Sequence, residues 1–238
     1  MWLSNSSIGR KAVMSITGLF LVLFLTFHMC MNLVALISPA GYNAVCQFLG
    51  ANWYALAGTV ILAAGAVLHI VYAFWLTLQN RKARGNDRYL VNTRPQNMLV
   101  LGIIVLLGLV LHLFNFWYKM QLNEIVGHLP EVNPHDGIAL IRETFGCPIY
   151  VVIYLIWFVA LWFHLTHGFW SAMQTIGINN HVWFNRWKCI SNIFATIGLC
   201  RRCHLFLCDE PDRLRNLHPL INQTIYSQKN NCYVYHRF

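Results

Sequence analysis

Three long stretches of this 238-residue chain contain no aspartate, glutamate, lysine or arginine: residues 12–80, 95–118 and 144–185. A helix needs about 20 consecutive apolar residues to cross the hydrocarbon core of a bilayer. The first stretch is long enough for two such helices with a turn between them, and each of the others is long enough for one. The chain is therefore predicted to be an integral membrane protein.

The composition supports this prediction. Only 11% of the residues are charged and 57% are hydrophobic, whereas a typical soluble domain has about 25% charged residues. We expect an all-α integral membrane protein, a transmembrane helix bundle with four full spans at about residues 12–37, 53–78, 98–118 and 148–173. The segment "SPAGYN" at residues 38–43 is rich in turn formers and is expected to be the turn between the first two spans.

Basic residues are concentrated at one end of the predicted spans. Arg10 and Lys11 precede the first span, and Arg186 and Lys188 follow the fourth. The loop after the second span contains five more basic residues: Arg81, Lys82, Arg84, Arg88 and Arg94. Short loops rich in lysine and arginine stay in the cytoplasm, so the N-terminus, this loop and the segment after the fourth span are expected to be cytoplasmic. The net charge of +9 mostly reflects this topology, and no nucleic-acid partner is expected.

Each predicted span contains a histidine. The four are His28, His69, His112 and His164, and His167 lies one turn beyond the last of them. An imidazole without partners in hydrocarbon costs several kcal/mol, so each ring needs a partner. For a single such histidine, a hydrogen bond between helices and a functional role are equally good explanations. Four histidines can be compared by their depth in the membrane.

The depth of each histidine is its distance in residues from the cytoplasmic end of its span. These ends are Arg10 for His28, Arg81 for His69, Arg94 for His112 and Ile176 for His164. His28 and His112 both lie 18 residues from that end, and His69 and His164 both lie 12 residues from it. At 1.5 Å per residue these counts place one layer of two histidines roughly 27 Å from the cytoplasmic edge and a second layer roughly 18 Å from it. The sequence therefore predicts two pairs, each formed between alternate spans.

Two layers of paired histidines in an apolar bundle are typical of haem iron with two imidazole ligands, because bundle cores build such sites from facing helices. Ligation would also satisfy ring nitrogens that the bilayer cannot. A path for zinc or copper is the competing interpretation, but it would normally include carboxylates or thiolates. The spans contain no acidic residue, and only Cys30 lies near a layer. Two b haems are therefore predicted, with His164 and His167 both open as the ligand of the fourth span.

Four segments around these histidines have a specific resemblance: "LTFHMCMNL", "AVLHIVYAF", "LVLHLF" and "FHLTHGFWSAMQTIG". They resemble the membrane cytochrome b subunit of succinate:quinone oxidoreductases, in the single-chain, five-helix, two-haem form of bacterial fumarate reductases and succinate dehydrogenases. The resemblance extends from the N-terminus to about Phe194. It implies that His28 and His112 bind the distal haem and that His69 and His164, rather than His167, bind the proximal haem.

The resemblance also implies a function in the bacterial cytoplasmic (inner) membrane. The chain would anchor a flavoprotein subunit and an iron–sulfur subunit on the cytoplasmic face, in contact with lipid, and would pass electrons between menaquinone and those subunits. It contains no glycine-rich dinucleotide motif and no iron–sulfur cysteine set in its membrane part, so the dicarboxylate site would belong to the other subunits. Succinate oxidation and fumarate reduction remain equally open as the physiological direction.

Some relatives that move protons across the membrane have a glutamate two residues before the ligand of the fourth helix. Trp162 occupies that position here, so a glutamate proton route of that kind is not expected.

Quinone contacts are expected among polar residues after the first span: Asn32, Asn43, Gln47 and Trp53. Each has an alternative role, since Asn32 suits helix packing and Trp53 suits an interfacial anchor.

A fifth apolar run begins near Trp187 and changes at about Gly198 to polar, cysteine-containing sequence. After roughly thirteen residues it is too short for a span, so a truncated fifth helix is expected. We divide the chain into a di-haem cytochrome b domain at residues 1–198 and an atypical tail at 199–238, which arose by loss of the native reading frame or as a lineage-specific extension. The tail segment "CRRCH" matches the C-x-x-C-H pattern of c-type haem, but a cytoplasmic location argues against that cofactor.

Two other functions remain as alternatives. The first is the cytochrome b subunit of a formate dehydrogenase, hydrogenase or nitrate reductase, which also uses histidine pairs but has a molybdenum or nickel partner. The second is a metal or solute transporter without haem.

Overall fold

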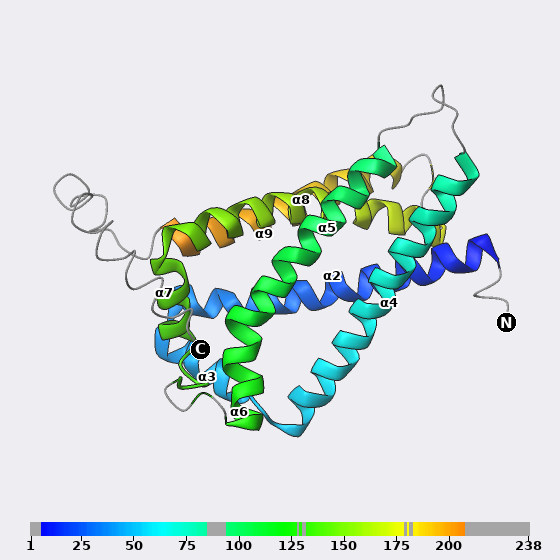
Figure 1. The fold of residues 1–238 in the computed structure, drawn as a ribbon. Coiled ribbons are helices and arrows are strands. Elements are labelled where there is room, and N and C mark those ends of the chain that lie inside the picture. Colours follow the sequence, from blue (N-terminus) through cyan, green and yellow to red (C-terminus); the bar gives the residue numbers. More distant parts are fainter. Residues whose placement is uncertain are drawn as a thin grey trace.

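The computed structural model describes residues 6–84, 94–127, 129, 132–178, 180 and 183–207, and the regular secondary structure of this part of the chain is all helix, with no strand. Its elements follow one another along the chain (Figure 1): α2 (Ser7–Ile37), α3 (Pro39–Phe48), α4 (Trp53–Arg84), α5 (Arg94–His112), the π-helix η2 (Leu113–Leu122), α6 (Asn123–Val126), α7 (Gly137–Gly146), α8 (Pro148–Ile176) and α9 (Trp183–Leu207). The predicted all-α class is confirmed for these residues.

Four helical segments are long and apolar enough to cross a membrane: Ile8–Ile37, Trp53–Ala83, Met98–Val126 and Pro148–Ile176. Each has at least 29 residues, and the three that are α-helical throughout are therefore about 44 Å long or longer, which exceeds the roughly 30 Å of a hydrocarbon core. Large apolar side chains on their outer faces are strongly exposed, among them Leu23 (70%), Val60 (68%) and Leu107 (65%). An exposed apolar surface of this extent needs lipid or protein to cover it.

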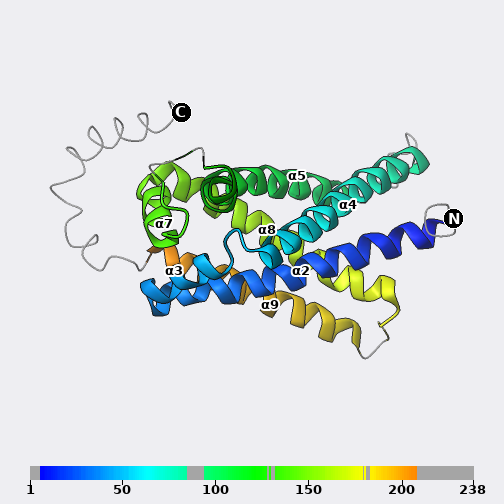
Figure 2. The ribbon, with the colours of Figure 1, turned by 90° about the horizontal axis from the view of Figure 1, so that it is seen from below.

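The four long apolar helices form a bundle in which each helix contacts two neighbours and faces the remaining helix across the interior (Figures 1 and 2). Helix α2 packs closely on α4 and on α8, α5 packs closely on α8, and α4 has a smaller contact with α5. The order around the bundle is therefore α4, α2, α8, α5. Helices α2 and α5 lie across the bundle from each other, and so do α4 and α8.

The two ends of the bundle differ in structure. The short helices α3, α6 and α7 gather at one end, here called the capped end (Figure 1). The opposite end, here called the basic end, contains the first turns of α2 and the last turns of α4, with Arg10, Lys11, Arg81 and Lys82. This segregation of charge is the one that predicted a cytoplasmic N-terminus.

The segment expected to be a turn at residues 38–43 is the start of helix α3. Only Ser38 separates α2 from α3, and its Oγ accepts a hydrogen bond of 3.0 Å from the amide of Gly41. Pro39 occupies the first turn of the helix, where its missing N–H is not needed. Serine and proline favour both turns and the starts of helices. Here they start a helix.

The third span changes its winding immediately after His112. The α-helix becomes a π-helix over Leu113–Leu122 and ends as the short α6. This wider turn buries the amides of Asn115 and Gln121. π-helical segments are rare and occur frequently at functional sites. This one begins directly after a predicted ligand, His112.

Helix α9 continues through the boundary predicted at Gly198 and ends at Leu207. It packs on α8, where the almost fully buried Ser191 donates a hydrogen bond to the carbonyl of Thr166. The fifth helix is thus longer than the apolar run that predicted its truncation. Residues 208–238 and the side chains of 198–207 lie outside the described residues, so the domain division and the role of "CRRCH" stay predictions.

A buried cluster of aromatic rings lies between α5 and α8. Tyr154, Trp157 and Phe158 of α8 form its centre. The indole N–H of Trp157 donates to the carbonyl of Val105 at 3.0 Å, and the ring lies against Gly108. A Cβ at Gly108 would be only 2.0 Å from this ring, so the two helices approach closely because position 108 has no side chain.

Candidate functional site

The four histidines of the apolar segments meet as two pairs. The ring centroids of His28 on α2 and His112 on α5 are 5.8 Å apart, and those of His69 on α4 and His164 on α8 are 6.5 Å apart. Both pairs connect helices that lie across the bundle from each other, so the four imidazoles extend into its interior. These are the pairs that the depth count predicted.

The ring separations fit a shared metal ion. Metal–imidazole bonds of about 2.0–2.1 Å and a ring radius of roughly 1.1 Å place the centroids of two trans imidazoles roughly 6.3 Å apart. The two observed separations lie within about 0.5 Å of that value. In addition, Nδ1 of His164 is buried and has no hydrogen-bond partner among the described residues. The pairs therefore fit a b haem held by one imidazole on each face.

His69 is held by helix α2. Its Nδ1 lies 3.2 Å from Oγ1 of Thr17, and a Cβ at Gly18 would lie 3.2 Å from its Cε1. Thr17 was not among the predicted site residues. The signal was the adjacent Thr17 and Gly18, because hydroxyl and small residues are enriched where membrane helices meet.

The structure distinguishes between the two histidines of α8. The ring of His164 is the one paired with His69, and it also lies beside Gly102 of α5. The ring of His167 contacts Trp170 one turn further along α8, with centroids 5.3 Å apart. His164 is thus the residue positioned opposite His69, as the resemblance implies.

The contacts of His69 with α2 and of His164 with α5 show how far apart the two histidine pairs are along the bundle. Thr17 contacts His69, and His28 lies eleven residues further along α2, which is about 16 Å at 1.5 Å per residue. Gly102 lies beside His164, and His112 lies ten residues further along α5, which is about 15 Å. Two independent helices therefore give the same spacing.

This spacing corrects the roughly 9 Å between layers that the sequence count predicted. Thr17, level with His69, is only seven residues from Arg10, or about 10 Å. The count from Arg81 put His69 roughly 18 Å deep. Along the bundle axis, Arg81 therefore lies further from the bundle centre than Arg10. The prediction assumed that these charged residues lie at the same level, and that assumption was wrong.

Aromatic rings surround His112. Its ring centroid is 5.1 Å from that of Phe116, 5.6 Å from that of Trp157 and 6.3 Å from that of Tyr154. The hydroxyl of Tyr154 accepts a 3.2 Å hydrogen bond from the amide of Asn115, which belongs to the π-helix. The side of His112 that faces α8 is therefore water-poor and fixed in position by the π-helix and the aromatic core.

Two of the quinone candidates hold the capped end together. The amide of Asn32 donates to the carbonyl of His28 at 2.7 Å and accepts from the hydroxyl of Tyr42 at 3.2 Å. The amide of Asn43 donates to Asp136 at 2.9 Å and accepts from the N–H of Ile138 at 3.2 Å. Both amides thus have tertiary partners, which supports the packing role weighed for Asn32.

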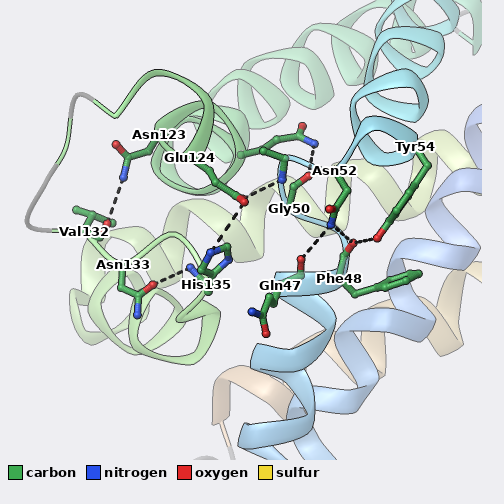
Figure 3. Close-up of polar contacts among 12 residues, drawn as sticks. Gln47, Phe48, Gly50, Asn52, Tyr54, Asn123, Glu124, Val132, Asn133 and His135 are labelled. Atoms are coloured by element: carbon green, nitrogen blue, oxygen red, sulfur yellow. Dashed lines mark hydrogen bonds and ion pairs between the residues drawn. The ribbon is translucent and has the colours of Figure 1, made fainter.

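The other two candidates lie near the surface of the same end. Trp53 is 81% exposed at the first turn of α4, as an interfacial anchor would be. Gln47 is exposed, and its carbonyl accepts a long 3.4 Å hydrogen bond from Asn52 (Figure 3). The structure places all four candidates around α3 but gives them different partners.

A polar cluster at the capped end was not predicted, and Gln121 is its centre. The buried amide of Gln121 donates to the carbonyl of Gly50 at 3.1 Å. Its oxygen accepts from Thr59 and from the indole of Trp117, both at 2.8 Å. One side chain of the π-helix therefore ties the α3–α4 connection to the third span.

Glu124 adds a second link from the same helix to the α3–α4 connection. Its carboxylate accepts from the amide of Ala51 at 2.9 Å and lies 3.9 Å from Nε2 of His135 (Figure 3). A Cβ at Gly50 would be 2.3 Å from the same carboxylate. The connection can pass this close because residue 50 is glycine.

The capped end also contains groups with shifted pKa values. Hydrogen bonds from the amide of Ala139, and then from Asn43, hold the pKa of Asp136 below its usual value. Burial raises the pKa of the Cys46 thiol to about 11 and also raises the pKa of Tyr42. Tyr42 and Cys46 are therefore neutral at pH 7, while Asp136 is ionised and caps α7.

Trp162 faces helix α9. Its indole N–H donates to the hydroxyl of Thr196 at 3.1 Å.

Comparisons with family models, with curated proteins and with solved structures find no match for this chain.

Proposed function

We propose that this chain is the membrane subunit of a succinate:quinone oxidoreductase and binds two b haems. The observation that supports this best is the meeting of four imidazoles as two pairs, at two levels, across the diagonals of an apolar bundle. The sequence around each of these histidines resembles the same family. The chain would pass electrons between menaquinone and an iron–sulfur subunit with its flavoprotein partner.

Each haem iron, when bound, supplies a one-electron ferric–ferrous couple. His28 and His112 would hold the haem nearer the capped end, and His69 and His164 the haem nearer the basic end. The chain's own residues fix the imidazoles and exclude water. Because the pairs are about 15–16 Å apart along the bundle, they form two successive sites between the two ends.

A transporter for metal ions is less well supported. In the part of the chain that the structure describes, no three or more His, Cys, Asp or Glu side chains are grouped to hold a metal ion. Zinc and copper sites generally use such groups. Two ligands per site suit haem, because the porphyrin supplies the remaining ligands.

The test is to isolate the full chain with its partners from membranes and add succinate while recording the haem absorption. We expect a flavin-containing dehydrogenase and an iron–sulfur protein to co-purify, and succinate to reduce part of the haem. A haem protein that co-purifies with a molybdenum or nickel enzyme, and is reduced by formate or hydrogen instead, would contradict the proposed partners. A haem-free protein would contradict the proposal altogether.

A further inference from the structure

The contact between Thr17 and His69 joins two helices through a hydrogen bond, and the backbone of Met14 on α2 also hydrogen-bonds to His69. Oγ1 of Thr17 on α2 lies 3.2 Å from Nδ1 of His69 on α4, and both side chains are partly buried. Either atom can act as donor or acceptor in principle. The direction of the bond follows from the other contacts of Thr17.

The hydroxyl of Thr17 has a single proton to donate. Oγ1 lies 2.9 Å from the carbonyl of Val13 and 3.1 Å from that of Met14, and carbonyls only accept. Both contacts are shorter than the 3.2 Å to His69, so we assign the proton to α2 and the acceptor role toward His69 to Thr17. This assigns the ring proton of His69 to Nδ1.

The backbone of α2 fixes the same edge of the ring. A Cβ at Gly18 would lie 3.2 Å from Cε1 and 3.6 Å from Nδ1 of His69. The Nδ1–Cε1 edge therefore lies against Thr17 and Gly18. A neutral imidazole protonated at Nδ1 has its lone pair at Nε2, so the nitrogen left to bind a metal is Nε2.

We infer that Thr17 is a positioning residue for the haem bound between His69 and His164, an inference that rests on the proposed function. By accepting the Nδ1 proton, Thr17 selects the tautomer that ligates through Nε2 and increases the electron density of the ring. Partners of this kind orient metal-bound histidines, and their loss typically costs about 10–100-fold in affinity or activity. A more electron-rich imidazole favours ferric over ferrous iron.

The packing alternative is that Thr17 only bonds to its own helix, as buried threonines often do. Thr77 of α4 provides that comparison, because its hydroxyl donates to the carbonyl of Ala73 at 2.7 Å and it is also partly buried. Thr77→Val therefore removes a hydroxyl of the packing type and serves as the control.

The experiment compares Thr17→Val, Thr17→Ser and Thr77→Val with the wild-type full chain. The haem content and the midpoint potential of each haem are measured by redox titration of the purified protein. We expect Thr17→Val to retain the haem of His28 and His112 and either to lose the other haem or to shift its ferric–ferrous equilibrium about tenfold toward ferrous, which is 59 mV for one electron. Thr17→Ser and Thr77→Val should match the wild type.

Equal potentials and equal haem content in wild type, Thr17→Val and Thr77→Val would overturn the inference while leaving the proposed function intact. The same holds if Thr17→Ser changes the haem as much as Thr17→Val, because the hydroxyl would then not be the active group. A wild-type protein without haem would overturn the proposed function itself. The retained second haem shows that the variant is folded.

Discussion

At the scale of single residues, each polar group in the bundle interior requires a specific partner. A polar atom without one costs free energy in an apolar medium, and hydrocarbon supplies none. Thr17 is hydrogen-bonded to His69, and Asn32 donates to the carbonyl of His28. Asn115 donates to the hydroxyl of Tyr154, which lies beside His112. The residues around the histidine pairs are therefore as constrained as the histidines.

Gly108 tests how tightly α5 packs on α8. We predict that Gly108→Ala lowers the stability by about 1–3 kcal/mol, because the new methyl group overlaps the ring of Trp157 and overpacking costs that much. The measurement is the thermal unfolding midpoint in detergent. Gly58→Ala is the control, since a Cβ there meets nothing within 4 Å and alanine favours the helix by about 0.8–1.0 kcal/mol. Equal midpoints for the two variants would contradict the close approach.

The sequence predicted which histidines pair because residue number orders them by depth within each span, but it gave the wrong spacing between the pairs because the charged reference residues lie at different levels. It did not predict Thr17 as the partner of His69 or Gln121 as the centre of a cluster. Those contacts depend on how each helix is rotated about its axis, and a uniformly apolar span has too weak a polar face to reveal its rotation. Trp162 illustrates the same limit, because its contact with Thr196 depends on the position of α9.

At the scale of elements, the π-helix after His112 connects the third span to the capped end. We predict that Gln121→Leu lowers the thermal midpoint and loosens the α3–α4 connection. The substitution removes the contacts of Gln121 with Thr59 and Trp117 and leaves the buried carbonyl of Gly50 without its donor, and an unsatisfied buried group costs about 1–3 kcal/mol.

Protection from hydrogen exchange at residues 49–52 measures the loosening of the connection. Gln174→Leu, at an exposed position near the end of α8, is the control and should change neither quantity. A Gln121→Leu protein with wild-type stability and exchange would show that the cluster does not hold the connection.

Helix α7 depends on the ionised form of Asp136. Because its folded-state pKa lies below the ordinary 3.8, its contribution to stability is present above pH 3.8 and is lost as the pH falls through the lower folded-state value. We predict a constant difference in thermal midpoint between wild type and Asp136→Ala from pH 7 to about pH 4, decreasing only below that. A difference that vanishes between pH 7 and pH 5 would contradict this assignment.

The four apolar helices could be predicted from the sequence because they depend on composition over long windows. Their starts at Trp53 and Pro148 and the end at Ile37 agree with the expected spans. The short α3 and α7 and the π-helix were not predicted. Each depends on one or two local contacts, such as the capping of α3 by Ser38 and of α7 by Asp136, and these are weak signals beside strong turn formers.

At the scale of the whole molecule, the order of the helices around the bundle explains the pairing. The facing helices, α2 with α5 and α4 with α8, meet through their histidine rings, and the neighbouring helices hold these rings in place through contacts such as Thr17 with His69 and Trp157 with His112. Two ligand pairs at two levels along one apolar bundle would let electrons move between its two ends while lipid surrounds it.

The most direct measurement is the number of b haems per chain, from the pyridine haemochrome spectrum of purified wild type and single alanine variants. We predict two haems in wild type and one in each of His28→Ala, His69→Ala, His112→Ala and His164→Ala, with both retained in His167→Ala. A colourless wild-type protein, or a His164→Ala protein that keeps both haems, would contradict the account.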